Sequence, residues 1–185
     1  MLHDRDAAQR LEIVMQSAVD ELLAKAAIAE LIFTYPRGLD RLDREILLSI
    51  AHPAATVEFS TLFKGSWVEY VDWLMKAHHA MIFNNHRISN MLIRINGAGA
   101  ASESTSTATL IAKREDGKFE DRLVYSRYLD RWRCDEGKWS LAHRLTVRDF
   151  RRVTIVTEEQ LKSYELVNAS KVGRTDPSYA LLGDV

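Results

Sequence analysis

The chain has little cysteine, proline or glycine: one, three and eight residues, respectively, in 185. Because Cys134 has no second cysteine to pair with, no internal disulfide can form, and the sequence makes no use of an oxidising compartment. The chain also lacks a run of 18 uncharged apolar residues, and its first ten residues are mostly polar or charged. We therefore expect no membrane segment and no secretory signal, and predict a cytoplasmic protein.

An excess of one charge sign is also missing, since 25 Lys and Arg stand against 26 Asp and Glu. The molecule has no electrostatic reason to bind a polyanion, so nucleic acid is not an expected partner. The glycines form neither G-x-G-x-x-G nor a phosphate loop, which argues against a nucleotide cofactor. His78 and His79 are adjacent and would diverge by about 100° on a helix, so they cannot chelate one ion together. We predict no cofactor and no metal.

Residues 10–50 have the pattern of helices. Tyr35 belongs to an apolar stripe with three- and four-residue spacing, so it is expected to point inward. Pro36 predicts that this helix kinks or ends there. Asp43 is a candidate N-cap for a short second helix over residues 44–51, and Ser66 for a third. The stripe of the first helix consists of Ile28, Leu31, Ile32, Tyr35 and Leu39.

The second half of the chain alternates as strands do. A short strand over residues 55–59 is followed, after the third helix, by long strands over residues 86–95, 100–114, 122–134 and 139–152. The turns between the long strands contain Asn96-Gly97, Asp116-Gly117 and Glu136-Gly137, which suit the positive φ of tight hairpins. We therefore expect an α+β domain over residues 1–156, in which N-terminal helices cover one antiparallel sheet. Thr157 and Gln160 predict a capping box for a C-terminal helical extension over residues 157–185.

Asp40 and His86 are the residues with the clearest chemical potential. The first closes the predicted long helix, and the second opens a predicted strand. If the fold brings them together, a carboxylate meets an imidazole, which is the minimum needed to move a proton at neutral pH. The alternative is structural: Asp40 pairs with a nearby arginine at a solvated helix end, and His86 is an ordinary strand residue. The nearby arginines are Arg37, Arg41 and Arg44.

The stretches AAIAELIFTYPRGLDRLDREILLSIAHPAATVEF, NNHRISNMLI and RYLDRWRCDEGKWSLAHRLTVRDF resemble the SnoaL-like family of the nuclear transport factor 2-like superfamily. Members of that superfamily include scytalone dehydratase, bile acid dehydratase and hexachlorocyclohexane dehydrochlorinase. The resemblance implies a cone-shaped barrel made of one strongly curved, mainly antiparallel sheet. It also implies a closed pocket in which a histidine–aspartate pair works without a cofactor.

By this resemblance, His86 and Asp40 occupy the positions of the catalytic pair, and Tyr35 and Arg148 those of side chains that stabilise negative charge. The implied activity is a cofactor-independent lyase that removes water from a small hydrophobic, ring-bearing substrate. Halide and formaldehyde are alternative leaving groups. Two further alternatives remain: a non-catalytic partner like the β subunit of ring-hydroxylating dioxygenases, and a steroid or polyketide isomerase or cyclase.

Aromatic side chains are expected to form the wall of such a pocket. A homo-oligomer is also expected, a trimer first and a dimer second, because the outer face of the predicted sheet is apolar. The extension after Thr157 is predicted to close the pocket as a lid or to bind a neighbouring subunit. The candidate wall residues are Phe59, Trp73, Phe83, Tyr125 and Trp132.

Overall fold

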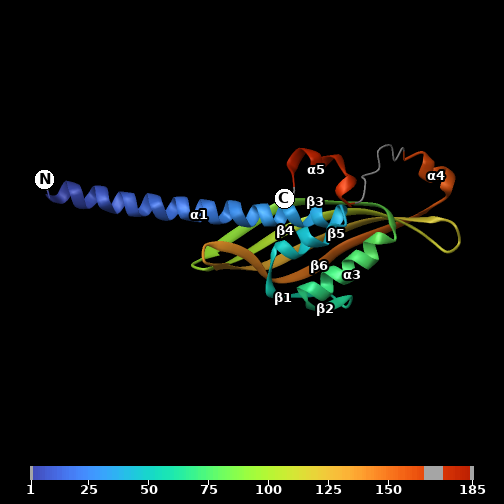
Figure 1. The fold of residues 1–185 in the computed structure, drawn as a ribbon, viewed down its shortest axis with the longest axis horizontal. Coiled ribbons are helices and arrows are strands. Elements are labelled where there is room, and N and C mark those ends of the chain that lie inside the picture. Colours follow the sequence, from blue (N-terminus) through green and yellow to red (C-terminus); the bar gives the residue numbers. More distant parts are fainter. Residues whose placement is uncertain (1, 165–172, 184–185) are drawn as a thin grey trace.

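The computed structural model describes residues 2–164 and 173–183 (Figure 1). The protein has the predicted α+β architecture. Its elements in chain order are α1 (Leu2–Asp40), α2 (Arg44–Ser49), β1 (Ala51–Phe59), β2 (Phe63–Ser66), α3 (Trp67–His79), β3 (Met81–Asn96), β4 (Gly99–Lys113), β5 (Phe119–Asp135), β6 (Lys138–Val156), α4 (Glu158–Lys162), the 3-10 helix η1 (Gly173–Thr175) and α5 (Pro177–Leu182).

The strands form one six-stranded sheet in the order β2-β1-β6-β5-β4-β3. All neighbours are antiparallel except β1 and β6, which run parallel. The three predicted hairpin turns are confirmed, because Gly97, Gly117 and Gly137 have φ values of 57°, 80° and 81°. The strong curvature and the cone shape stay predictions.

Two strand predictions need correction. Strand β2 was missed, because its four residues show no alternating pattern that would distinguish it from a loop. Strand β3 begins at Met81, so His86 lies inside this strand and does not open it. Asn84 and Asn85, which disfavour strands, hid the earlier start. Their amides are instead used by α1, since Asn84 Nδ2 donates to the carbonyl oxygen of Leu39 at 3.0 Å.

The sequence predicted a kink or an end at Pro36. Helix α1 continues through Pro36 to Asp40, so the predicted end is wrong. A proline removes one backbone hydrogen bond, and the buried stripe on either side of it compensates through tertiary packing. Tyr35 and Leu39 of that stripe are buried as predicted. The N-terminal part of α1 extends well beyond the sheet (Figure 1). It carries the exposed apolar side chains Ile13, Val14, Met15, Val19, Leu22 and Leu23.

The predicted homo-oligomer stays a prediction. Within the described part of the chain, no helix is both long enough and apolar enough to cross a membrane.

Helices α1, α2 and α3 share one hydrophobic core with the sheet. The predicted caps that orient α2 and α3 are confirmed: Asp43 accepts from two backbone N–H groups of α2, and Ser66 forms a capping box with Glu69. The indole N–H of Trp67 donates to the carbonyl oxygen of Leu47 at 2.7 Å, which joins α3 to α2. The helices are therefore fixed to one another as well as to the sheet.

A fully buried ion pair lies inside this core. Arg144 of β6 donates through Nε and Nη2 to the two carboxylate oxygens of Asp130 of β5, at 2.8 Å each, and both side chains are 0% exposed. The guanidinium carbon is 4.2 Å from the ring centroids of both Tyr35 and Tyr128. The guanidinium therefore packs against one aromatic ring of α1 and one of β5, and joins the helix to the sheet.

Replacing one partner of this pair is expected to destabilise the fold strongly. Arg144→Met leaves the Asp130 carboxylate buried and uncompensated, which typically costs about 3–5 kcal/mol in the free energy of unfolding. The measurement is urea denaturation followed by circular dichroism. The matched control is Arg131→Met, an exposed arginine of the same sheet. If both variants unfold at the same urea concentration, the buried pair has no such role.

Candidate active site

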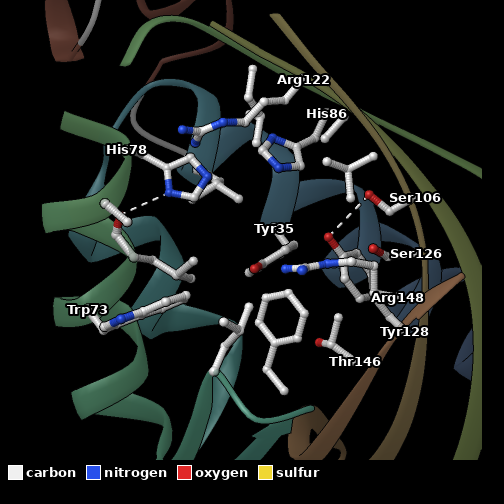
Figure 2. Close-up of a pocket in the computed structure, with 18 of the residues that line it drawn as sticks. Tyr35, Trp73, His78, His86, Ser106, Arg122, Ser126, Tyr128, Thr146 and Arg148 are labelled. Carbon is white, nitrogen blue, oxygen red and sulfur yellow. Dashed lines mark hydrogen bonds between the residues drawn. The ribbon is translucent and has the colours of Figure 1, made fainter. Parts of the chain in front are cut away.

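A cavity of about 320 Å³ lies between the helices α1 and α3 and the sheet (Figure 2). Side chains from α1, α3, β1, β3, β4, β5 and β6 line it. Its volume lies within the range of sites that bind small organic ligands. Three of the four predicted catalytic residues, His86, Tyr35 and Arg148, line this cavity.

Asp40 and His86 are in direct contact at one side of the cavity. The Nδ1 atom of His86 is 2.7 Å from Oδ1 of Asp40, and the backbone N–H of His86 donates to Oδ2 at 2.8 Å. The side chain of His86 is only 7% exposed and that of Asp40 only 9%. A carboxylate can only accept, so Nδ1 of His86 carries the hydrogen, and in the neutral form of the imidazole the lone pair is on Nε2. His86 lines the cavity, whereas Asp40 lies behind it.

The structural alternative for Asp40, pairing with a nearby arginine, is wrong. Each of the three arginines has a different partner, and Asp40 receives its hydrogen bonds from β3. Burial of the helix end explains the difference, because the surrounding chain supplies competing partners. These partners are Ser178 for Arg37 (2.8 Å), Asp176 for Arg41 (3.2 Å) and Asp72 for Arg44 (2.8 Å).

Phenol groups form another side of the cavity. The hydroxyl oxygens of Tyr35 and Tyr70 are 3.5 Å apart, and the hydroxyl of Tyr128 donates to Oγ of Ser106 at 3.1 Å. Burial raises the pKa of Tyr35 and Tyr128 well above the ordinary value and that of Tyr70 to about 12, although the charge of Arg144 acts in the opposite direction. All three phenols therefore stay protonated at neutral pH. The hydrogen of Tyr128 is used by Ser106, whereas the pair of Tyr35 and Tyr70 retains an O–H group that can donate to a ligand oxygen.

Arg148 lies at the cavity beside an aromatic wall. Its guanidinium carbon is 5.4 Å from the ring centroid of Phe59, and this ring meets the ring of Trp73 edge to face at 6.3 Å. Burial lowers the pKa of Arg148, and the nearby Arg151 adds to this effect. Within residues 2–164 and 173–183, no carboxylate forms an ion pair with Arg148. The guanidinium is therefore available to an anionic group of a ligand.

Three of the five predicted wall residues lie elsewhere. Tyr125 is 39% exposed and packs against Phe150, because alternate residues of β5 face opposite sides of the sheet. Trp132 is buried in the core beyond the cavity, where its indole N–H donates to Oγ of Ser102 at 2.8 Å. Phe83 packs against the small cluster at the other end of the sheet. Of the five predicted wall residues, Phe59 and Trp73 line the cavity.

The C-terminal extension also differs from the prediction. The capping box of Thr157 and Gln160 is confirmed, but α4 ends at Lys162, and the rest of the predicted helix reaches residues outside the described ones. None of residues 173–183 lines the cavity; they pack against the end of α1 instead. In this structure residues 173–183 therefore do not cover the cavity.

Sequence reasoning missed several residues of the cavity. His78 was considered only as a metal ligand, yet it follows Val71 and Leu74 at helical spacing on the buried face of α3, which is a signal that it points inward. Among the described residues, no group of three or more His, Cys, Asp or Glu side chains is arranged to hold a metal ion. The other missed side chains are Tyr70, Ser106, Tyr128, Thr146 and Arg122.

Helices packed on a mixed six-stranded sheet around one cavity define the class of the protein: an α+β domain of the nuclear transport factor 2-like superfamily. The chain belongs to the SnoaL-like domain family, whose profile matches residues 20–145. The family resemblance of the sequence is thereby confirmed. A comparison with curated protein sequences finds no significant match.

Solved structures share this fold at low sequence identity. A proposed scytalone dehydratase from Novosphingobium aromaticivorans superposes with a TM-score of 0.65 at 20% identity, covering 76% of this chain and 95% of that protein. The hexachlorocyclohexane dehydrochlorinase LinA-type3 from Novosphingobium barchaimii gives 0.65 at 15% identity, covering 74% and 94%. The Kfla4162 protein from Kribbella flavida gives 0.62 at 17% identity, covering 69% and 92%. At these identities the similarity establishes the fold.

The buried His78 is expected to make stability depend on pH. Burial, with a contribution from His86, lowers the pKa of His78 from 6.5 to about 4. The unfolded chain therefore binds this proton at higher pH than the folded chain. The free energy of unfolding consequently falls as the pH decreases from about 6.5 to about 4, and above this window His78 contributes no slope. At about 1.4 kcal/mol per pH unit, the loss is about 3 kcal/mol.

Urea denaturation of the parent and of His78→Gln between pH 7 and pH 4 measures this effect. The difference between the two proteins isolates the contribution of His78 from that of carboxylates that titrate in both. The exposed neighbour provides a matched control, since His79→Gln is expected to keep the pH dependence of the parent. Equal pH dependence in the parent and in His78→Gln would contradict the expected protonation state.

Proposed function

We propose that the protein is a cofactor-independent lyase that eliminates water from a small hydrophobic, ring-bearing substrate. The proposal depends on one observation: the carboxylate of Asp40 accepts from both the ring Nδ1 and the backbone N–H of His86. These two contacts hold the imidazole in one orientation and in one tautomer. The lone pair of Nε2 is then available as a general base toward the cavity.

The elimination begins when Nε2 of His86 takes a proton from a carbon or a phenol of the substrate. Asp40 stabilises the imidazolium that forms. The carbon–oxygen bond breaks, and the leaving oxygen takes up the proton from the imidazolium while the phenol of Tyr35 donates a hydrogen bond to it, so that water and a new double bond result and His86 is neutral again. Arg148 stabilises negative charge on the substrate.

The names of two structural relatives agree with this reaction class. A scytalone dehydratase removes water and a dehydrochlorinase removes hydrogen chloride, and both names denote eliminations. The same groups in this protein suit halide or formaldehyde as alternative leaving groups, since the proton is removed in the same way. The phenol pair of Tyr35 and Tyr70 supports a second candidate, an isomerase in which protonated phenols stabilise an enolate and the proton returns to another carbon.

Loss of His86 is expected to abolish most of the activity and to leave the fold intact. The assay is a panel of aryl alcohols, chlorinated rings and hydroxy-steroids, in which alkene absorbance, chloride and formaldehyde are recorded separately. General acid-base catalysis is typically worth about a hundredfold to ten-thousandfold in rate, so His86→Ala and Asp40→Asn should each lose a factor in this range on any compound that the parent converts.

His79→Ala is the matched control, because this exposed histidine is outside the cavity and should retain full activity. A His86→Ala variant that converts a verified substrate at the parent rate would exclude the mechanism. A product that keeps all its atoms but has a moved double bond would favour the isomerase over the lyase.

A further inference from the structure

A second imidazole, on α3, faces the same cavity. His78 of α3 is 8% exposed, lines the cavity, and has its ring centroid 5.6 Å from that of His86. Its Nδ1 atom is 3.0 Å from the carbonyl oxygen of Leu74, one helical turn earlier. Figure 2 shows the two histidines on neighbouring sides of the cavity, with the ring of His78 turned toward its interior.

The contact with Leu74 decides which nitrogen of His78 can bind a ligand. A carbonyl oxygen can only accept, so Nδ1 carries the hydrogen and Nε2 keeps the lone pair. Within the described residues, Nε2 has no hydrogen-bond donor from the protein. His78 lines the cavity, so a ligand whose donor group reaches this lone pair gains a hydrogen bond there.

We propose that Nε2 of His78 accepts a hydrogen bond from a hydroxyl group of the substrate, and that the substrate is therefore a hydroxylated ring compound. This inference rests on the proposed function only in assigning the cavity to a substrate. It identifies a recognition contact that is separate from the proton transfer at His86.

The distribution of donors and acceptors around the cavity supports a hydroxyl at this position. The phenols of Tyr35 and Tyr70 and the guanidinium of Arg148 are donors, so they suit an acceptor oxygen of the ligand. The face of α3 next to His78 presents Trp73 and Leu74, which suit a ring. His78 stays an acceptor at neutral pH, because burial and the neighbouring His86 lower its pKa to about 4.

Paired ligands test this inference without turnover. The probes are 2-naphthol and 2-methoxynaphthalene, in which a methyl group replaces the hydroxyl hydrogen. The measurement is isothermal titration calorimetry at pH 7.5. The parent is expected to bind the naphthol about tenfold more tightly, since an ether leaves Nε2 without a donor. His78→Phe should lose this preference. His78→Gln should recover part of it, because the amide oxygen of glutamine can occupy the position of Nε2.

Three outcomes would overturn the inference: no preference in the parent, an unchanged preference in His78→Phe, or loss of the preference only in His86→Phe, which would assign the hydroxyl to the other imidazole. Thermal melting confirms that each variant is folded, and His79→Phe serves as the surface control. Because binding is measured without catalysis, failure here leaves the lyase proposal standing, and failure of the His86→Ala test leaves this one standing.

A different observation concerns the C-terminal segment. Residues 173–183 dock on the turn between α1 and α2. Asp176 forms an ion pair with Arg41 at 3.2 Å, and the hydroxyl of Tyr179 donates to Oδ2 of Asp43 at 2.7 Å. Both residues of the segment are buried. The segment therefore holds the residues on the C-terminal side of Asp40.

The geometry points to Asp176 as a positioning residue that keeps the guanidinium of Arg41 away from the Asp40 carboxylate. Arg41 directly follows Asp40 in the chain. Its charged hydrogen bond to Asp40 would be stronger than that of the neutral imidazole of His86. Without Asp176, Arg41 would therefore compete for the carboxylate that orients His86.

Proton NMR of the full chain tests this role through the Nδ1 hydrogen of His86, whose downfield resonance is assigned by its absence from His86→Ala. We expect Asp176→Asn to weaken or remove the resonance and Asp176→Glu to keep it. The double variant Asp176→Asn with Arg41→Gln should restore it, because the competing charge is then gone. An unchanged resonance in Asp176→Asn, or no restoration in the double variant, would overturn the positioning role.

Discussion

The contact between Asp40 and His86 is the interaction on which the rest of the site depends. One carboxylate at the end of α1 accepts from the ring and the backbone of a residue inside β3, so the same bond attaches the helix to the sheet and sets the imidazole tautomer. The carboxylate thus accepts two hydrogen bonds from one residue. Their combination gives the strand residue a defined orientation at the cavity wall, which is what general base catalysis requires.

The residues around this contact bind the positive charges that could compete with His86 for Asp40. The arginines next to Asp40 in sequence are all held by other residues, and two of those residues belong to the C-terminal segment. Deeper in the core, Arg144 forms an ion pair with Asp130 and packs against the rings of Tyr35 and Tyr128. Burial outweighs the charge of Arg144 and keeps the pKa of Tyr35 raised. The cavity thus combines neutral phenol donors, two imidazole acceptors and one unpaired guanidinium, a set that suits a polar ring compound better than a pure hydrocarbon.

Much of the fold could be predicted, and the errors have identifiable causes. The caps at Asp43, Ser66 and Thr157 and the three glycine turns were correct, because each depends on atoms within a few residues. The predicted helix end at Pro36 was wrong because packing on both sides of the proline overrides its local preference. Tyr125 and Trp132 were misassigned since composition indicates that a strand has aromatic side chains but not which of them reach the cavity.

The sequence by itself determined the α+β class, the family and the residue types available for proton transfer. These properties follow from periodicity, turn chemistry and a resemblance that spans most of the chain. Only the tertiary structure decided which partners those residues have. Asp40 and His86 are 46 positions apart, and Arg41 and Asp176 are separated by most of the chain. Local preference carries no information about such contacts, because they form only when the helices close over the sheet and every buried charge must find a partner.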